Sequence, residues 1–578
     1  MKKIKIIFSI VVLLAIFTSC EKDLLEKYPL DQVSVEDFFY TSNDLEIYMN
    51  YLYHASIFFP DANGWGGGRR GIFSQEINSD NQLYEGSLSS HLDGTRTIPA
   101  IDGGWSYFWV RKVNYFFDHY KKCEDPLYTY KQSLGEAYFF RAIIFYNLVQ
   151  NFGDVVWLNT VADVDSEILY SARMPRNEVI DKILTDLDSA VVYLATERIE
   201  QGTRINKWYA LAFQSRVALY EGSWEKYHAG DPFGVAGSDP NKYFNKAVEA
   251  ATKVINSGRF EIYSTGHPET DYYNFFALGS YSNSKSVLFW EKFSKDLDKT
   301  NKIRVNGLYP YGEGLTKGLV DSYLCTDGKP ISVSPLFAGY DTIVNEMKNR
   351  DPRLYQSVWS PSAPWKIKDG KTTTWERVWL KLQKNANYRC TTGFANRKGY
   401  NAYDEARDFT GEETPVLLFR YAEVLLNYAE AKAELGSISQ ADIDITIKPI
   451  RDRVGMPNLI IANIVNDPNW DFPTLSPIIN EIRRERRVEL ASEGIRWHDV
   501  ARWAAADELI AGKRPKGIKL GTQLKYNIYP VDENGFLDPY FDALGDDGYG
   551  FNINRDYLDP LPINEITLNP NLGQNPGW

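Results

Sequence analysis

The sequence predicts a mostly α-helical fold, in which helices pair in the manner of tetratricopeptide repeats and long irregular insertions carry small β-hairpins. Three observations favour this class. Five segments place apolar residues at helical spacing, these segments combine small alanines with large aromatics, and three long polar stretches interrupt the helical pattern.

The helical segments have apolar side chains every three or four residues, which is the spacing of one helix face. In the second segment, for example, Ile180, Ile183 and Leu187 fall on the same face. Most segments end at or near a glycine, a residue that stops helices because it readily adopts left-handed backbone conformations. We expect helices over residues 132–151, 177–195, 205–222, 242–258 and 417–436.

Small residues are spaced so that these helices can pack closely in pairs. The stretches 214–222 and 427–436 share a run of small residues that ends in an aromatic or leucine and a glycine. Alanines one turn apart let two helices approach, and large side chains opposite fill the remaining space. This is the packing of tetratricopeptide pairs, whose period is about 34 residues.

Three insertions separate the helical segments, at residues 60–105, 264–315 and 325–410. They are rich in Gly, Asn, Ser, Asp and Tyr and show few helical faces. Loops of this length inside a folded chain usually form functional surfaces or contain small hairpins of their own. The insertions are therefore where we look for functional residues.

Composition narrows the class of function. The chain has 578 residues, a formal net charge of −12 and a pI near 5.3. Because neutralising a phosphate backbone needs concentrated Lys and Arg, an acidic chain argues against a nucleic-acid partner. The 15 Trp, 38 Tyr and 30 Phe leave aromatic side chains to spare after a core is filled.

The first twenty residues predict export and lipid anchoring. Three lysines precede an apolar run at residues 6–17, which is too short to span a bilayer and is typical of a signal peptide. The run leads into FTSC, which resembles a bacterial lipobox. We expect residues 1–19 to be removed and Cys20 to carry fatty acyl chains, palmitate among them, as the only membrane anchor. An ordinary cleaved signal with a chance cysteine is the alternative.

Three further cysteines, Cys123, Cys325 and Cys390, follow at wide spacing. An odd number in an exported chain predicts buried free thiols, or one disulfide with a spare thiol.

The sequence contains only incomplete versions of catalytic and cofactor-binding motifs. Residues 66–71 fit G-x-G-x-x-G, but they lack the preceding strand and following helix of a dinucleotide site. His498 and Asp499 hint at a catalytic triad, yet no G-x-S-x-G sequence supplies a serine. The six histidines show no metal-binding spacing. We therefore expect no enzyme activity and no cofactor, and the sequence leaves a structural calcium ion open.

An arginine-rich segment, residues 483–487, could indicate nucleic-acid binding. Glutamates alternate with these arginines, and apolar residues flank them. This pattern predicts a helix that pairs its charges with itself and with neighbouring helices.

Aromatic side chains in polar loops are the best candidates for a binding site. A flat ring can stack on the apolar face of a sugar, while amides and carboxylates bond the hydroxyls. The candidates for an oligosaccharide platform are Trp65, Asp80, Asn81, Tyr84, Tyr281, Trp290, Tyr309 and Tyr311. For each residue alone, packing within a loop is the alternative, and Trp290 also fits a strand. Trp105 and Trp109, just before a helical aromatic run, are assigned to the core.

Distinctive segments along the whole mature chain resemble the SusD/RagB family and occur in that family's order. They include GEAYFFRAIIFYNLVQNFGDVVWL, INKWYALAFQSRVALYEGSWEKYH and RYAEVLLNYAEAKAELG. The matching segments lie at residues 135–158, 205–228, 318–331, 350–358, 420–436, 482–503 and 562–578.

The resemblance implies a surface-exposed outer-membrane lipoprotein of a polysaccharide-utilisation system. In such proteins a tetratricopeptide scaffold docks on a SusC-like TonB-dependent transporter, and loops hold a glycan or, in the RagB branch, a peptide. The implied organisation is a tether at 20–40, a SusD-like N-terminal part at 41–320 and a RagB/SusD C-terminal part at 321–578. It assigns no ligand-binding residue, because the family's ligand loops share no motif that this sequence matches.

The hypothesis from the sequence is a protein that captures an oligosaccharide outside the cell and delivers it to a transporter. A peptide-binding lid of the transporter is one alternative. A surface glycoside hydrolase is another, although sequence alone does not place two carboxylates at catalytic separation.

Overall fold

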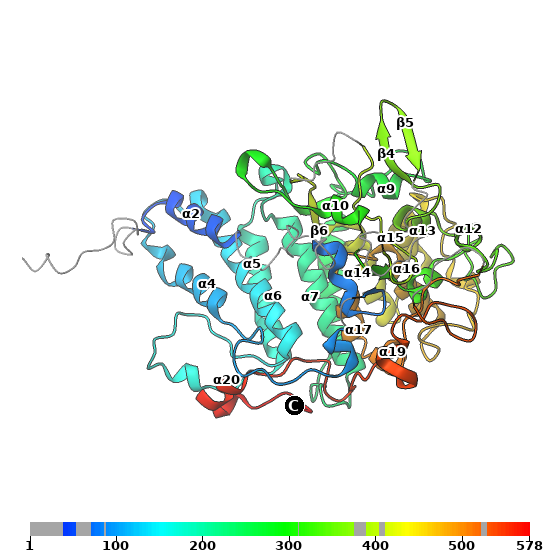
Figure 1. Cartoon of the computed structure of the whole chain (residues 1–578). Helices are drawn as coiled ribbons and strands as arrows, with labels where there is room; N and C mark the ends of the chain where they lie inside the picture. The colour runs from blue at the N-terminus through cyan, green and yellow to red at the C-terminus, as the bar shows by residue number, and fades with distance from the viewer. Residues whose placement is uncertain are drawn as a thin grey trace, which may run out of the picture.

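A row of paired helices forms the body of the molecule (Figure 1). The computed structural model describes residues 38–53, 71–85, 88–309, 311–374, 389–403, 411–521 and 529–578. The longer helices are α2 (Ser42–Tyr53), α4 (Phe108–His119), α5 (Leu127–Phe152), α6 (Arg176–Tyr193), α7 (Lys207–Tyr227), α8 (Pro240–Ile255), α14 (Tyr421–Glu434), α15 (Gln440–Asp452) and α16 (Pro477–Glu489). Helices α5 to α8 pack in chain order, and α14 then packs against α8, α15 and α16.

Short helices connect this body and its loops. The short α-helices are α3 (Ser90–Asp93), α9 (Asp271–Phe276), α10 (Ile303–Leu308), α11 (Lys317–Ser322), α12 (Ile343–Met347), α13 (Pro352–Ser357), α17 (Arg496–Arg502), α18 (Ala506–Leu509), α19 (Phe541–Leu544) and α20 (Ile563–Leu568). The 3₁₀ turns are η2 (Gly71–Asn78), η3 (Tyr120–Lys122), η4 (Glu167–Tyr170), η5 (Ile199–Gly202), η6 (Lys295–Leu297), η8 (Ile461–Asn463), η9 (Gly545–Asp547) and η10 (Pro570–Leu572).

The five predicted helices are confirmed as α5, α6, α7, α8 and α14, with one correction. The segment predicted to start at Leu417 becomes helical only at Tyr421, because Val416–Arg420 forms strand β6. An apolar run such as VLLFR fits a buried strand as well as a helix, so periodicity does not separate the two. The start of α7 is fixed by Asn206, whose side chain accepts hydrogen bonds from the backbone of Trp208 and Tyr209.

Small residues allow the close helix packing that the sequence predicts. A Cβ atom on Gly222 of α7 would lie 2.9 Å from the Phe244 ring of α8. A Cβ atom on Gly135 of α5 would lie 2.8 Å from Leu194, just after α6. Both distances are too short for a side-chain carbon, so any other residue at these two contacts would force a neighbour to shift.

Strands form three two-stranded antiparallel sheets in the described part of the chain. The pairs are β1 (Gln82–Tyr84) with β3 (Glu313–Leu315), β2 (Val287–Glu291) with β6 (Val416–Arg420), and β4 (Pro364–Lys368) with β5 (Lys371–Thr374). Only β4–β5 is a local hairpin of the kind expected in an insertion. The other two pairs join segments that are far apart in the sequence, and β1–β3 connects the first insertion to the second.

The largest hydrophobic core runs through α5, α7 and α14 and continues into the C-terminal segment. It contains, for example, Phe140 from α5, Phe213 from α7 and Leu425 from α14, all almost fully buried. The two parts predicted on either side of residue 320 thus share one core. The boundary between them stays a prediction from the family resemblance.

The arginine-rich segment lies on α16, inside the protein. Arg486 Nε donates to Asp499 of α17 at 2.8 Å, and Arg487 Nη2 donates to Asp80 at 2.7 Å. The prediction of a helix that pairs its charges with its neighbours is therefore confirmed. Cys123, Cys325 and Cys390 are free thiols; Cys325 and Cys390 are buried and Cys123 is half-buried.

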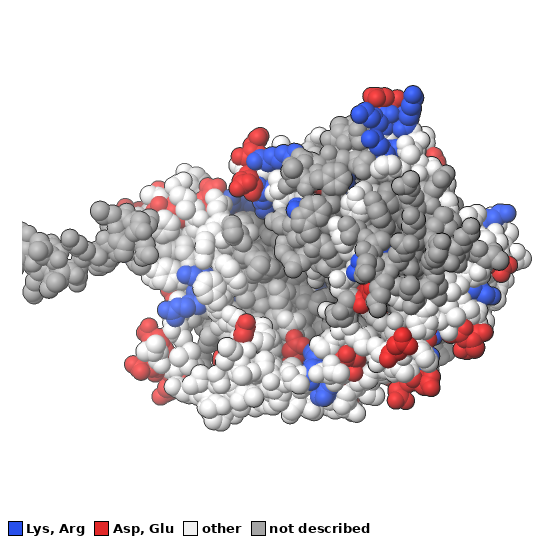
Figure 2. Space-filling model, in the orientation of Figure 1, with Lys and Arg blue, Asp and Glu red and all other residues white. Residues whose placement is uncertain are grey.

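Charged side chains are unevenly distributed on the face shown in Figure 2. Lysines mark the β4–β5 hairpin, and acidic side chains gather at the lower edge around α19, where Asp542, Asp546 and Asp547 are exposed. Within the described residues, every helix is too short or too polar to cross a bilayer.

Candidate ligand-binding site

The β1–β3 pairing brings three of the predicted tyrosines into neighbouring parts of the structure. Tyr84 pairs with Glu313 across the ladder, two residues from Tyr311. The rings of Tyr309 and Tyr311 lie 6.0 Å apart, centroid to centroid, with their planes inclined by 53°. Tyr84, Tyr309 and Tyr311 are all half-buried, so each keeps part of its surface open to solvent. We call these three residues the tyrosine platform.

A sharp turn before β3 positions Tyr311. Its φ is +52°, and that of the following Gly312 is +98°, so two successive residues have left-handed backbone conformations. A Cβ atom on Gly312 would lie 2.9 Å from Cβ of Glu85, which leaves room only for glycine. The Glu85 amide also donates to the Gly312 carbonyl at 3.0 Å. A non-glycine residue with positive φ is uncommon and is found preferentially at functional sites.

Tyr540 holds the backbone of Tyr84. Its hydroxyl donates to the Tyr84 carbonyl at 2.6 Å and accepts from the Tyr84 amide at 3.2 Å. Burial raises the pKa of Tyr540 to about 12, so the hydroxyl keeps its proton at neutral pH. These two hydrogen bonds use only the main-chain atoms of Tyr84. The Tyr84 side chain is therefore not needed for the contact with Tyr540.

Charged groups lie beside the platform. Arg389 forms an ion pair with Glu85, and its carbonyl accepts a hydrogen bond from the Gly312 amide at 2.9 Å. Both side chains are partly exposed. Rings flanked by a carboxylate and a guanidinium can stack on a sugar and bond its hydroxyls.

Asp80 and Asn81 have a different role from the predicted one. The Asp80 carboxylate accepts hydrogen bonds from Arg487 and Arg496 at 2.7 Å. Burial alone would raise the pKa of Asp80, but these two guanidinium groups lower it to about 2. Asn81 donates to Glu76 and accepts from Arg487 Nε at 2.8 Å. Their polar atoms are used to hold arginines of the C-terminal half, so they do not face a ligand.

Tyr281 and Trp290 are core residues in the structure, with exposed fractions of 1% and 2%. The Tyr281 hydroxyl donates to the Phe275 carbonyl, and the Trp290 indole donates to the Gln201 carbonyl. A ring enclosed on all sides cannot stack on a sugar that arrives from solvent. Trp290 lies in strand β2, which agrees with the alternative that it is a strand residue.

Two other predicted residues, Trp65 and the lipidation site Cys20, lie outside the described residues and stay predictions. Trp105 is 7% exposed, as expected for a core residue, and Trp109 packs partly buried against the same core.

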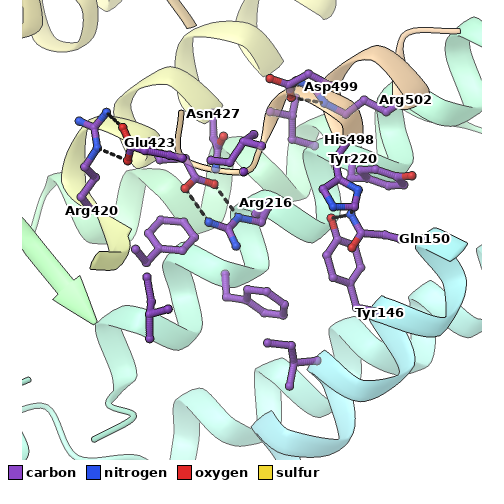
Figure 3. Close-up of a pocket in the computed structure, with 18 of the residues that line it drawn as sticks. Tyr146, Gln150, Arg216, Tyr220, Arg420, Glu423, Asn427, His498, Asp499 and Arg502 are labelled. Atoms are coloured by element: carbon purple, nitrogen blue, oxygen red, sulfur yellow. Dashed lines mark hydrogen bonds and ion pairs between the residues drawn. The ribbon is translucent and has the colours of Figure 1, made fainter. Parts of the chain in front are cut away.

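A cavity of about 240 Å³ between α5, α7, α14 and α17 was not predicted (Figure 3). Arg216 of α7 and Glu423 of α14 form a bidentate ion pair at its wall, with both N–O distances 2.6 Å. On the opposite side, Gln150 Nε2 lies 3.0 Å from the Tyr146 hydroxyl and 3.2 Å from His498 Nδ1. The sequence held one signal for this cavity, namely polar residues such as Gln150, Arg216 and Glu423 inside predicted helices.

The cavity does not assemble a catalytic triad. Asp499 bonds to Arg486 and Arg502, and His498 bonds to Gln150. Burial lowers the pKa of His498 to about 4, so the imidazole is neutral at neutral pH. Among the described residues, no group of three or more His, Cys, Asp or Glu side chains is arranged to hold a metal ion.

Comparison with known proteins identifies the family of this paired-helix fold. The model of the SusD family matches residues 289–578, just over half of the chain. A second family model, described as starch-binding associating with outer membrane, matches residues 74–219. The chain therefore belongs to the SusD family, as the sequence segments indicated.

Individual relatives agree with this assignment. SusD-like protein P2 of Formosa agariphila is 26% identical over the full length of both chains. The crystal structure of a SusD-like protein from Bacteroides fragilis has a TM-score of 0.70 at 23% identity and covers 96% of this chain and all of its own. A SusD-like carbohydrate binding protein from the same species has a TM-score of 0.69 at 21% identity, covering 93% and 99%. These structures confirm the predicted helical SusD-like fold.

Proposed function

We propose that this protein is a lipid-anchored protein of the outer-membrane surface that binds an oligosaccharide and delivers it to a SusC-like TonB-dependent transporter. Family membership supports the class, since one matching family model is named for starch binding and outer-membrane association. One structural relative is named as carbohydrate binding. The lipobox-like sequence before Cys20 supports the anchor.

The observation that carries the proposal is the tyrosine platform. Tyr84 comes from the first insertion and Tyr309 and Tyr311 from the second, and β1–β3 pairs the two insertions. Backbone hydrogen bonds of Gly312 and the Tyr540 hydroxyl fix the main chain of the platform, and the three tyrosines are half-buried. Rigid, half-exposed rings bind sugars with little loss of side-chain entropy.

The mechanism requires capture and local concentration, without chemical change of the ligand. Stacking on a few rings gives modest affinity. An anchor on the membrane and contact with the transporter would keep the bound sugar near the transporter entrance, where its effective concentration exceeds that in free solution.

Isothermal titration calorimetry of the purified protein, with Cys20→Ser to prevent acylation, tests this proposal against a panel of neutral oligosaccharides. We expect one glycan class to bind and Tyr309→Ala to weaken it about threefold to tenfold, from the loss of one stacking contact. Tyr128→Ala is the matched control, because Tyr128 is 74% exposed at the start of α5, outside the platform. It should leave the affinity unchanged.

The same samples separate the alternatives. Binding of peptides but of no glycan would replace this proposal with a peptide-binding lid. Release of reducing ends from the bound glycan would replace it with a hydrolase.

A further inference from the structure

We propose that a second site, separate from the tyrosine platform, binds a small ligand through an oxyanion group such as a carboxylate. The site is a cavity of about 490 Å³ between α11, α16 and the loop at residues 467–472. This volume lies within the range of small-molecule sites. Asp471 on its wall is 42% exposed, so the cavity reaches the surface.

Arg483 of α16 lines this cavity and is a buried cation with too few partners. Its side chain is 2% exposed. Its one carboxylate contact is Nη2 to Glu434 Oε1, at 3.4 Å, and its Nε has no acceptor. Glu434 already accepts from Lys226 Nζ at 2.6 Å and from the Tyr227 hydroxyl at 2.8 Å. Arg483 therefore shares one distant carboxylate with two other donors, which leaves part of its hydrogen-bonding capacity unused.

Aromatic rings stabilise Arg483 without satisfying its hydrogen bonds. The guanidinium carbon lies 4.2 Å from the Trp503 ring centroid, 4.5 Å from that of Phe472 and 4.6 Å from that of Tyr227. Ring faces attract the charge but do not accept the in-plane N–H bonds that an oxygen would. The rings therefore fix the position of the guanidinium and leave its N–H groups short of acceptors.

Trp470 also lines this cavity and has a donor without an acceptor. Its indole Nε1 is buried and has no hydrogen-bond partner. Indole and guanidinium N–H groups are donors only, so a ligand that satisfies both must present acceptor oxygens. A planar or tetrahedral oxyanion has several acceptor oxygens and a charge that complements Arg483.

The other basic residues of the wall are already paired. Arg487 bonds to Asp80, Asn81 and Ser322, and Arg484 bonds to Asp467 and Glu481. Lys317 bonds to Asp321, and Arg496 bonds to Asp80. Arg483 is thus the wall cation whose charge a ligand would neutralise.

Calorimetry at constant ionic strength tests the site with three probes: D-galacturonate as a sugar acid, sulfate as an inorganic oxyanion, and D-galactose as the neutral counterpart. We expect galacturonate to bind and galactose not to bind. Trp470→Phe keeps the ring and removes the N–H, so it should weaken binding about fivefold. Arg483→Gln should weaken it at least about tenfold. Trp208→Phe is the matched control, because the Trp208 indole bonds to the Thr196 carbonyl, away from the cavity.

Each outcome is decisive. If sulfate binds and galacturonate does not, the oxyanion site stands and its ligand is a free inorganic anion. If neither anion binds, or if Trp470→Phe and Trp208→Phe behave alike, the site is rejected. If Arg483→Gln does not fold, Trp470→Phe still tests the site. A thermal melt shows whether each variant is folded. Tyr309→Ala leaves this cavity intact, so failure here and failure of the tyrosine platform are distinguishable.

Discussion

Arg420 Nη1 donates a hydrogen bond to Glu489 Oε1 at 2.6 Å, and both side chains are almost fully buried. Arg420 is the last residue of β6 and Glu489 the last of α16. Glu489 also accepts from Arg353 and Arg453, at 2.9 and 2.6 Å. One carboxylate thus joins three segments of the C-terminal half, and the three guanidinium groups hold its pKa well below its usual range despite burial.

Glu489→Gln should destabilise the protein by about 3–5 kcal/mol, because it leaves buried guanidinium groups without their shared counter-charge. Urea unfolding at pH 7 measures the change. Glu249→Gln is the control: Glu249 is half-exposed and pairs only with Lys253, so its loss should change stability by less than about 1 kcal/mol. Equal effects of the two substitutions would show that the network around Glu489 contributes no more than a surface pair.

Gly222→Ala tests the close approach of α7 and α8. The new methyl group would lie 2.9 Å from the Phe244 ring, which is closer than van der Waals contact allows. We expect a net loss of about 1–3 kcal/mol, although alanine favours helix over glycine. Thermal melting measures it, with Gly279→Ala as the control, since a Cβ there meets nothing within 4 Å. An increase in melting temperature for Gly222→Ala would mean that the helices separate at little cost.

Stability should fall on acidification through the titration of His498. Unfolded histidine takes up a proton near pH 6.5, whereas burial lowers the pKa of folded His498 to about 4. Between these values the unfolded chain binds more protons, so stability declines as pH falls from about 6.5 to 4 and returns as pH rises. The contribution is at most about 3 kcal/mol.

His498→Gln removes this proton uptake. Urea unfolding at pH 7 and pH 4.5 should therefore show a smaller loss of stability for the variant than for the unchanged protein. Parallel curves for both proteins would mean that His498 is solvated in the folded state.

The sequence predicted the scaffold well because helix periodicity and small-residue spacing are local signals. The same local signals could not distinguish a strand from a helix at Val416–Arg420, where every residue is apolar except the last. They also could not reveal the β1–β3 and β2–β6 pairs, since pairing between strands more than a hundred residues apart leaves no periodic trace.

The sequence predicted only part of the candidate site, because local signals do not show which distant residues a side chain contacts. Loop position separated Tyr84, Tyr309 and Tyr311 from the core aromatics. The structure brings the Tyr309 and Tyr311 rings together and places Tyr84 on the strand that pairs with β3. Asp80 resembled a ligand-binding carboxylate only because its partners, Arg487 and Arg496, lie some four hundred residues further along the chain. Tyr281 lies in an insertion, yet its ring is packed against Trp290 in a core that the insertion itself helps to build.

A crystal structure with the best-binding oligosaccharide from the calorimetric panel tests the central claim most directly. We predict sugar rings stacked on Tyr309 or Tyr311, within reach of Tyr84 and the Glu85–Arg389 pair. An oligosaccharide seated instead in the cavity between α5 and α7, with the three tyrosines untouched, would contradict the assignment of the binding surface.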